Sequence, residues 1–169
     1  TVSDLSQPPD LLDMIVKTLP KLIADKVDIN RANLYRTYLD ADLKRQKVHN
    51  RSELLLSTAE RFSVLQRLAF MAYTGAAPTI NFTDAQNLIE QHINSPKIDL
   101  HACTRDFLTN SFLIRKGDDY HFSHKSIMEY LIAVHFDEEI KQGSPVTFGH
   151  VELEYGILSF LREFEPGRE

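Results

Sequence analysis

The sequence predicts a mainly α-helical fold, in which a helical subdomain is followed by three further helices and a small β-hairpin. Apolar residues recur at intervals of three and four in several segments, which is the spacing of helices with one buried face. The clearest strand periodicity lies in 111–122, where two short runs flank a turn that contains Gly117. Three helices and then a hairpin is the order of a winged-helix domain, with the hairpin as the wing.

The N-terminal part predicts a helical subdomain over residues 1–50. Pro9 suits the first turn of a helix, where its missing N–H costs nothing, and Pro20 is expected to kink or divide that helix. A second helix is expected after Asn30, which serves as its N-cap. The apolar faces predicted for the two helices are Leu11, Leu12, Ile15, Val16, Leu19, Leu22 and Ile23, and then Leu34, Tyr35, Tyr38, Leu39 and Leu43.

The winged-helix domain is expected over 51–137, and a polar connection at 44–57 marks the boundary before it. Ser57 and Glu60 have the spacing of a capping box. The helix that follows carries apolar residues on almost every side, so we expect it to be buried in the centre of the domain.

Shorter elements are predicted around this central helix. Ile80 and Phe82 indicate a short strand, and Thr83-Asp-Ala-Gln86 indicates another capping box that opens the next helix. A helix over 99–110 precedes the hairpin. The remaining chain, 138–169, is expected to form a linker and a last helix near the C-terminus with nothing obvious to pack against.

The residues on both sides of His124 predict a strand that turns directly into an amphipathic helix. Tyr120 and Phe122 alternate with polar neighbours, which is strand periodicity. Ser126 with Glu129 has the spacing of a capping box, so His124 is expected near a helix N-terminus, where an anion is favoured. The apolar face of this helix consists of Ile127, Tyr130, Leu131 and Val134. Taken alone, the local sequence favours a simpler interpretation, a polar residue at a helix entrance.

Composition limits the class of protein. The chain has 169 residues and is 43% hydrophobic, which is ordinary for one or two small globular domains. No apolar run approaches the about 20 residues of a membrane span, and no signal peptide is apparent, so no membrane partner is expected. The chain begins without Met, so we expect a piece of a longer protein. A single cysteine, Cys103, suits the reducing cytoplasm.

A twelve-residue motif resembles the signature of a known family. Phe122-Ser-His-Lys-Ser-Ile-Met-Glu-Tyr-Leu-Ile-Ala133 is similar to Phe-x-His-x-Ser-x-x-Glu-(Tyr/Phe)-x-x-Ala, which closes the winged-helix domain of NACHT-type STAND NTPases, the NLR-like signalling ATPases. The resemblance implies that His124 contacts the β-phosphate of bound ADP and holds the protein in its inactive form. It also implies a proline near the adenine ring at the first helix, for which Pro8 and Pro9 are both candidates; simple helix initiation explains either proline equally well.

The resemblance further implies the partners of this segment. ADP or ATP would be bound mainly by the P-loop core of the same parent chain, and the full-length protein would form a homo-oligomer on activation, in defence signalling. The region 138–169 would contain the start of a C-terminal sensor. Neither the Gly-x-x-x-x-Gly-Lys-Ser/Thr motif nor any glycine followed by lysine occurs in the sequence. This segment is therefore not expected to be an enzyme, although its parent is expected to be an ATPase.

Other kinds of site are disfavoured by the residue pattern. His121 and His124 are separated by the strand-to-helix break, so a metal site with the nearby Asp118 and Asp119 is not expected. A nucleophile–base pair of Ser126 and His124 lacks an orienting acid at a recognisable spacing.

Charge argues against a nucleic-acid partner. The formal net charge is −5, and the helix expected over 99–110 contains one basic and two acidic side chains. Affinity for DNA depends on Lys and Arg that neutralise phosphates. The alternative function is a winged-helix adaptor or transcription-factor module that binds protein or DNA without a nucleotide.

Overall fold

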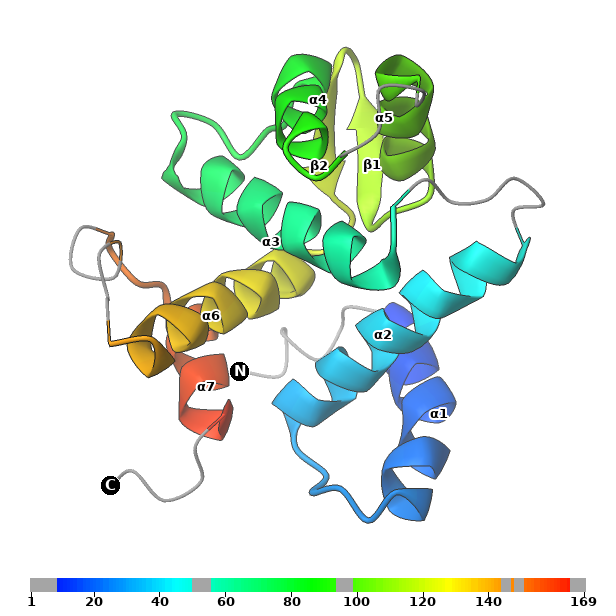
Figure 1. The fold of residues 1–169 in the computed structure, drawn as a ribbon. Coiled ribbons are helices and arrows are strands. Elements are labelled where there is room, and N and C mark those ends of the chain that lie inside the picture. Colours follow the sequence, from blue (N-terminus) through cyan, green and yellow to red (C-terminus); the bar gives the residue numbers. More distant parts are fainter. Residues whose placement is uncertain (1–8, 50–55, 94–98, 144–146, 148–150, 165–169) are drawn as a thin grey trace.

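The computed structural model describes residues 9–49, 56–93, 99–143, 147 and 151–164. The described elements are, in chain order, α1 (Pro9–Ala24), α2 (Arg31–His49), α3 (Thr58–Thr74), α4 (Phe82–Glu90), α5 (Leu100–Thr109), β1 (Leu113–Lys116), β2 (Asp119–Phe122), α6 (Lys125–Lys141) and α7 (Tyr155–Phe164) (Figure 1). The predicted fold class, mainly α with a small β-hairpin, is confirmed. No helix in the described ranges is long and apolar enough to cross a membrane.

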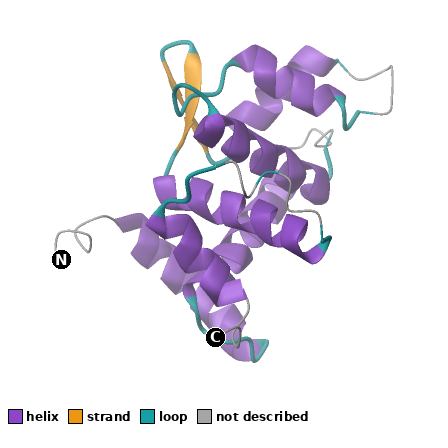
Figure 2. Ribbon diagram, turned by 90° about the vertical axis from the view of Figure 1, so that its left-hand side faces the viewer, coloured by secondary structure: helices purple, strands orange, loops and turns teal. Residues whose placement is uncertain are grey.

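The middle of the chain adopts the winged-helix order. Helices α3, α4 and α5 are followed by the antiparallel strands β1 and β2, with Leu113 opposite Phe122 and Lys116 opposite Asp119. Gly117 has a φ of +69° at the turn between the strands, as the sequence predicts. The hairpin stands at the edge of the helical layers (Figure 2).

A third, one-residue strand lies between α3 and α4. Ile80 exchanges two backbone hydrogen bonds with Tyr120 of β2, with N···O distances of 2.9 and 2.8 Å. The predicted strand is therefore present at Ile80, but Phe82 already belongs to α4. The Asn81 side chain caps that helix by accepting from Asp84 N at 2.8 Å, so the capping box predicted from Thr83 is wrong. Asn81 begins the helix two residues earlier and leaves Thr83 inside its first turn.

The core lies where α3 crosses α6 (Figure 1). Leu65 and Leu68 of α3 and Leu131 and Ile132 of α6 are completely buried. The prediction that α3 is central is confirmed. Its capping box is also confirmed, because the Ser57 side chain accepts from Glu60 N and Glu60 accepts from Ser57 N.

Several predicted helix boundaries are wrong. Helix α2 continues to His49 instead of ending in a polar connection at 44–57, and α6 continues to Lys141 where a loop was expected from Asp137. In the added turn of α6 the polar residues Glu138 and Lys141 are exposed, which a helix tolerates as well as a loop does. The boundaries predicted between the domains 1–50, 51–137 and 138–169 stay predictions.

The first helix differs from its prediction in two ways. Helix α1 is not divided at Pro20, which is exposed, so the one internal hydrogen bond that the proline removes does not end this helix. The buried residues of α1 are Met14, Thr18 and Leu22. Of the expected face, Leu12, Val16 and Ile23 are exposed because α2 covers the opposite side of the helix.

The last helix, α7, has partners that the sequence did not indicate. It packs against α6 and α2, and its residues Ile157 and Phe160 are completely buried. The expectation that this helix has nothing to pack against is wrong, because the faces that receive it are supplied by segments distant in the sequence.

Candidate functional site

The strand-to-helix corner after the hairpin places His124 at the N-cap position of α6. The residue is extended, with φ −138° and ψ 133°, and its carbonyl accepts the hydrogen bonds of Ile127 N at 3.2 Å and Met128 N at 3.4 Å. The corner is fixed by Ser123 N, which donates to Phe112 O at 2.8 Å. Backbone hydrogen bonds on both sides of His124 therefore set its position.

The N-terminus of α6 has no side-chain cap from His124. The predicted capping box of Ser126 and Glu129 is wrong, because the helix already begins at Lys125 and Ser126 lies inside its first turn. The N–H groups of a first turn that lacks an internal cap favour an external anion.

The imidazole of His124 is half-buried, so the residue lies at the surface of the domain and not in its hydrophobic core. Pro9, the other described residue of the predicted nucleotide site, opens α1, and Pro8 lies outside the described residues. The two predicted site residues, His124 and Pro9, stand at the starts of different helices, α6 and α1, and their common role at a nucleotide stays a prediction.

Charged side chains surround the start of α6. Lys125 Nζ lies 2.5 Å from Glu154 Oε2 and 3.7 Å from Glu129 Oε1. The hydrogen bond to Glu154 raises the pKa of Lys125, so this residue stays positively charged. Burial is the main cause that raises the pKa of Glu129, against the opposing effect of Lys125. The Glu129 side chain is only 14% exposed.

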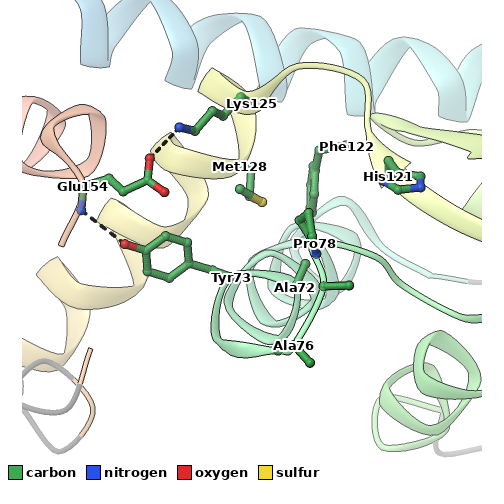
Figure 3. A pocket seen from close by; sticks show the side chains of 11 residues that line it. Ala72, Tyr73, Ala76, Pro78, His121, Phe122, Lys125, Met128 and Glu154 are labelled. Atoms are coloured by element: carbon green, nitrogen blue, oxygen red, sulfur yellow. Dashed lines mark hydrogen bonds and ion pairs between the residues drawn. The ribbon is translucent and has the colours of Figure 1, made fainter. Parts of the chain in front are cut away.

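A cavity of about 480 Å³ lies beside this corner, between α3, β2, α6 and the segment before α7 (Figure 3). Lys125 and Glu154 point toward each other across one side of it, and Tyr73 Oη accepts a bond from Glu154 N at 3.2 Å. Residues that line it include Ala72, Phe122, Met128, Tyr73, Lys125 and Glu154. His121 also lines the cavity, whereas His124 is not among its lining residues.

Important partners at the corner were missed from the sequence. Glu154 is 29 residues from Lys125 and carries no motif of its own. Gly156 packs against the Glu129 carboxylate so closely that a Cβ there would lie 2.3 to 2.4 Å from it. In the described part of the chain, no three side chains of His, Cys, Asp or Glu converge on a point that suits a metal ion.

The fold and this corner define a class: a mainly α-helical protein with a winged-helix arrangement, whose hairpin leads through a histidine into a buried helix. Comparison with models of protein families, with curated protein sequences and with solved structures gave no significant match. The function must therefore be argued from the residues themselves.

Proposed function

We propose that this chain is the regulatory helical and winged-helix segment of a NACHT-like STAND signalling NTPase. In this proposal His124 helps to hold the ADP-bound, inactive state, and its release permits oligomerisation of the full-length protein. One observation carries the proposal. The histidine of the twelve-residue signature occupies the N-cap position of α6, directly behind the wing.

The donors at this corner suit a phosphate group. The first turn of α6 has no side-chain cap from His124, and its N–H groups carry the positive end of the helix dipole. His124 stands at the same corner and is half-buried. Ring N–H groups and backbone N–H groups are the usual ligands of phosphate oxygens. The nucleotide itself would be held mainly by the P-loop core of the parent protein.

The proposed mechanism is a latch between domains. His124 donates a hydrogen bond to a phosphate oxygen and so ties the winged helix to the P-loop core. A charge-assisted bond of this kind contributes about 1.5–3 kcal/mol, which biases a two-state equilibrium about tenfold to a hundredfold. When the bond is lost, the winged helix moves away and its surface becomes available to other copies of the protein.

The test uses the parent protein with its P-loop core and the variant His124→Ala. The proposal predicts that ADP dissociates about ten to a hundred times faster from this variant and that basal oligomerisation rises. His121→Ala is the matched control, because this histidine is three residues away on the other side of the corner and lines the cavity. Equal ADP release from wild type and His124→Ala would refute the latch.

The winged-helix arrangement itself favours the alternative, a module that binds DNA or protein without nucleotide. Helix α5, which follows two helices and precedes the wing, is the element expected to enter the DNA in such modules. Its exposed side includes Arg105, but an acidic N-cap, Asp99, starts the helix. A gel shift at physiological salt separates the two functions, because the latch predicts no DNA affinity and the alternative predicts a shifted band.

A further inference from the structure

Helix α7 joins two parts of the molecule that are far apart in the sequence. Its completely buried Phe160 packs edge-on against Tyr35 of α2, with ring centroids 5.0 Å apart, and against Tyr130 of α6, at 5.4 Å. Tyr35 and Tyr130 also contact each other at 5.7 Å. Phe160 therefore completes an aromatic cluster to which α2, α6 and α7 each contribute one ring.

Polar contacts fix α7 to the start of α2. Glu163 Oε2 accepts a hydrogen bond from Ala32 N at 2.8 Å, in the first turn of α2. That turn has no acidic residue of its own, so α7 supplies the negative charge that the helix dipole favours. The Arg31 guanidinium lies 3.8 Å from the centre of the Phe160 ring and donates to Gly156 O at 3.4 Å.

A second set of contacts fixes the same segment to the start of α6. Glu154 pairs with Lys125, the residue next to His124, at 2.5 Å. Gly156 lies directly against the Glu129 carboxylate, where no larger residue fits without displacing it. The segment 154–163 thus holds the first turn of α2 through one end and the first turns of α6 through the other.

We propose that Glu154, Gly156, Phe160 and Glu163 form an α7 clamp, a conformational device that keeps α2 and the start of α6 in one arrangement. Release of α7 loosens both helices together and leaves α4, α5 and the hairpin unchanged, because the contacts described above for the clamp residues are with α2, α3 and α6. The clamp goes beyond the proposed function and requires no nucleotide. Only its consequence rests on the latch: a signal that acts on α7 would reach His124 through Glu154 and Lys125.

Hydrogen–deuterium exchange of this 169-residue chain tests the clamp. Glu163→Gln weakens the α2 side, and the decisive readout is the opposite side, the amides of 128–132 in α6. Glu154→Gln weakens the α6 side at its ion pair with Lys125, and its decisive readout is the first turns of α2, at 34–39. The clamp predicts faster exchange at the far side in both variants: about tenfold for Glu163→Gln, which weakens a charge-assisted hydrogen bond, and a smaller increase for Glu154→Gln, whose ion pair is partly exposed. Glu152→Gln is the matched control, an exposed acidic residue just ahead of the clamp.

Each outcome of the exchange experiment either supports or overturns the clamp. Faster exchange at the far side, with α4 and α5 unchanged, supports the clamp. Faster exchange that stays at the altered contact means that α7 packs without coupling the two helices, and overturns it. Equal acceleration in every element means general destabilisation, and also overturns it. Since no nucleotide is present in these measurements, none of these three results depends on the latch.

Discussion

The buried arginine Arg61 gives the sharpest stability prediction. This α3 residue is 1% exposed and lies 5.5 Å from the centre of the Phe107 ring of α5. It donates to Asn110 O and lies 3.5 Å from Asp106 Oδ2. Burial lowers the pKa of Arg61, an effect that Asp106 opposes. The buried Arg61 side chain therefore connects α3 to the C-terminal end of α5.

Arg61→Met keeps most of the volume and removes the donors. The lost bond from a charged donor is worth about 1.5–3 kcal/mol, and the contact with the aromatic ring adds about 0.5–1 kcal/mol. The variant does not leave the Asp106 carboxylate buried without a partner, because this side chain is 27% exposed and still accepts a hydrogen bond from Asn110 Nδ2 at 2.8 Å. The free energy of unfolding should therefore fall by about 2–4 kcal/mol, a large share of the stability of an ordinary domain.

Urea unfolding followed by circular dichroism measures this loss. With a slope of about 2 kcal/mol per molar urea, the midpoint should fall by about 1–2 M. Arg67→Met is the matched control on the same helix, because Arg67 is exposed and donates a hydrogen bond to the exposed Gln91 side chain. Its effect should stay within about 0.5 kcal/mol. If Arg61→Met unfolds at the same urea concentration as Arg67→Met, the assigned role of Arg61 is wrong.

Three further predictions concern a cap, a turn and a buried carboxyl group. Ser57→Ala removes the cap of α3 and should cost about 1 kcal/mol in the same urea experiment; no change would mean that the cap contributes nothing. Gly117→Ala should cost about 1 kcal/mol because φ is +69° there, and an unchanged melting temperature would contradict this reasoning. Glu129 has a folded-state pKa above its ordinary 4.5, mainly through burial, so the folded state binds more protons than the unfolded state between the two values. Stability from this group should therefore fall as pH rises above about 4.5, and Glu129→Gln should lessen that fall; identical pH profiles of the two proteins would exclude the effect.

Capping motifs illustrate how far local sequence predicts this fold. The same Ser-x-x-Glu spacing occurs at Ser57 and at Ser126. At Ser57 the prediction is confirmed, because the residue is extended and the helix begins directly after it. At Ser126 the helix has already begun at Lys125, and His124 is the N-cap. The spacing of Ser and Glu identifies the motif but does not by itself fix where the helix begins.

The candidate site was predicted only in part for a similar reason. The position of His124 near a helix N-terminus follows from the change of periodicity around it, which is a local signal. Contacts between distant segments leave no such signal: Lys125 and Glu154 are 29 residues apart, and Ala32 and Glu163 are 131 apart. The partners that fix the corner and hold α7 were therefore visible only in the folded chain.

The most direct test of the central claim compares ADP with AMP. The latch assigns His124 to the β-phosphate, which AMP lacks, so the two nucleotides separate this contact from all others. In the parent protein, His124→Ala should weaken ADP binding about tenfold to a hundredfold and leave AMP binding nearly unchanged. An equal loss for both nucleotides, or no loss for ADP, would contradict a histidine that contacts the β-phosphate.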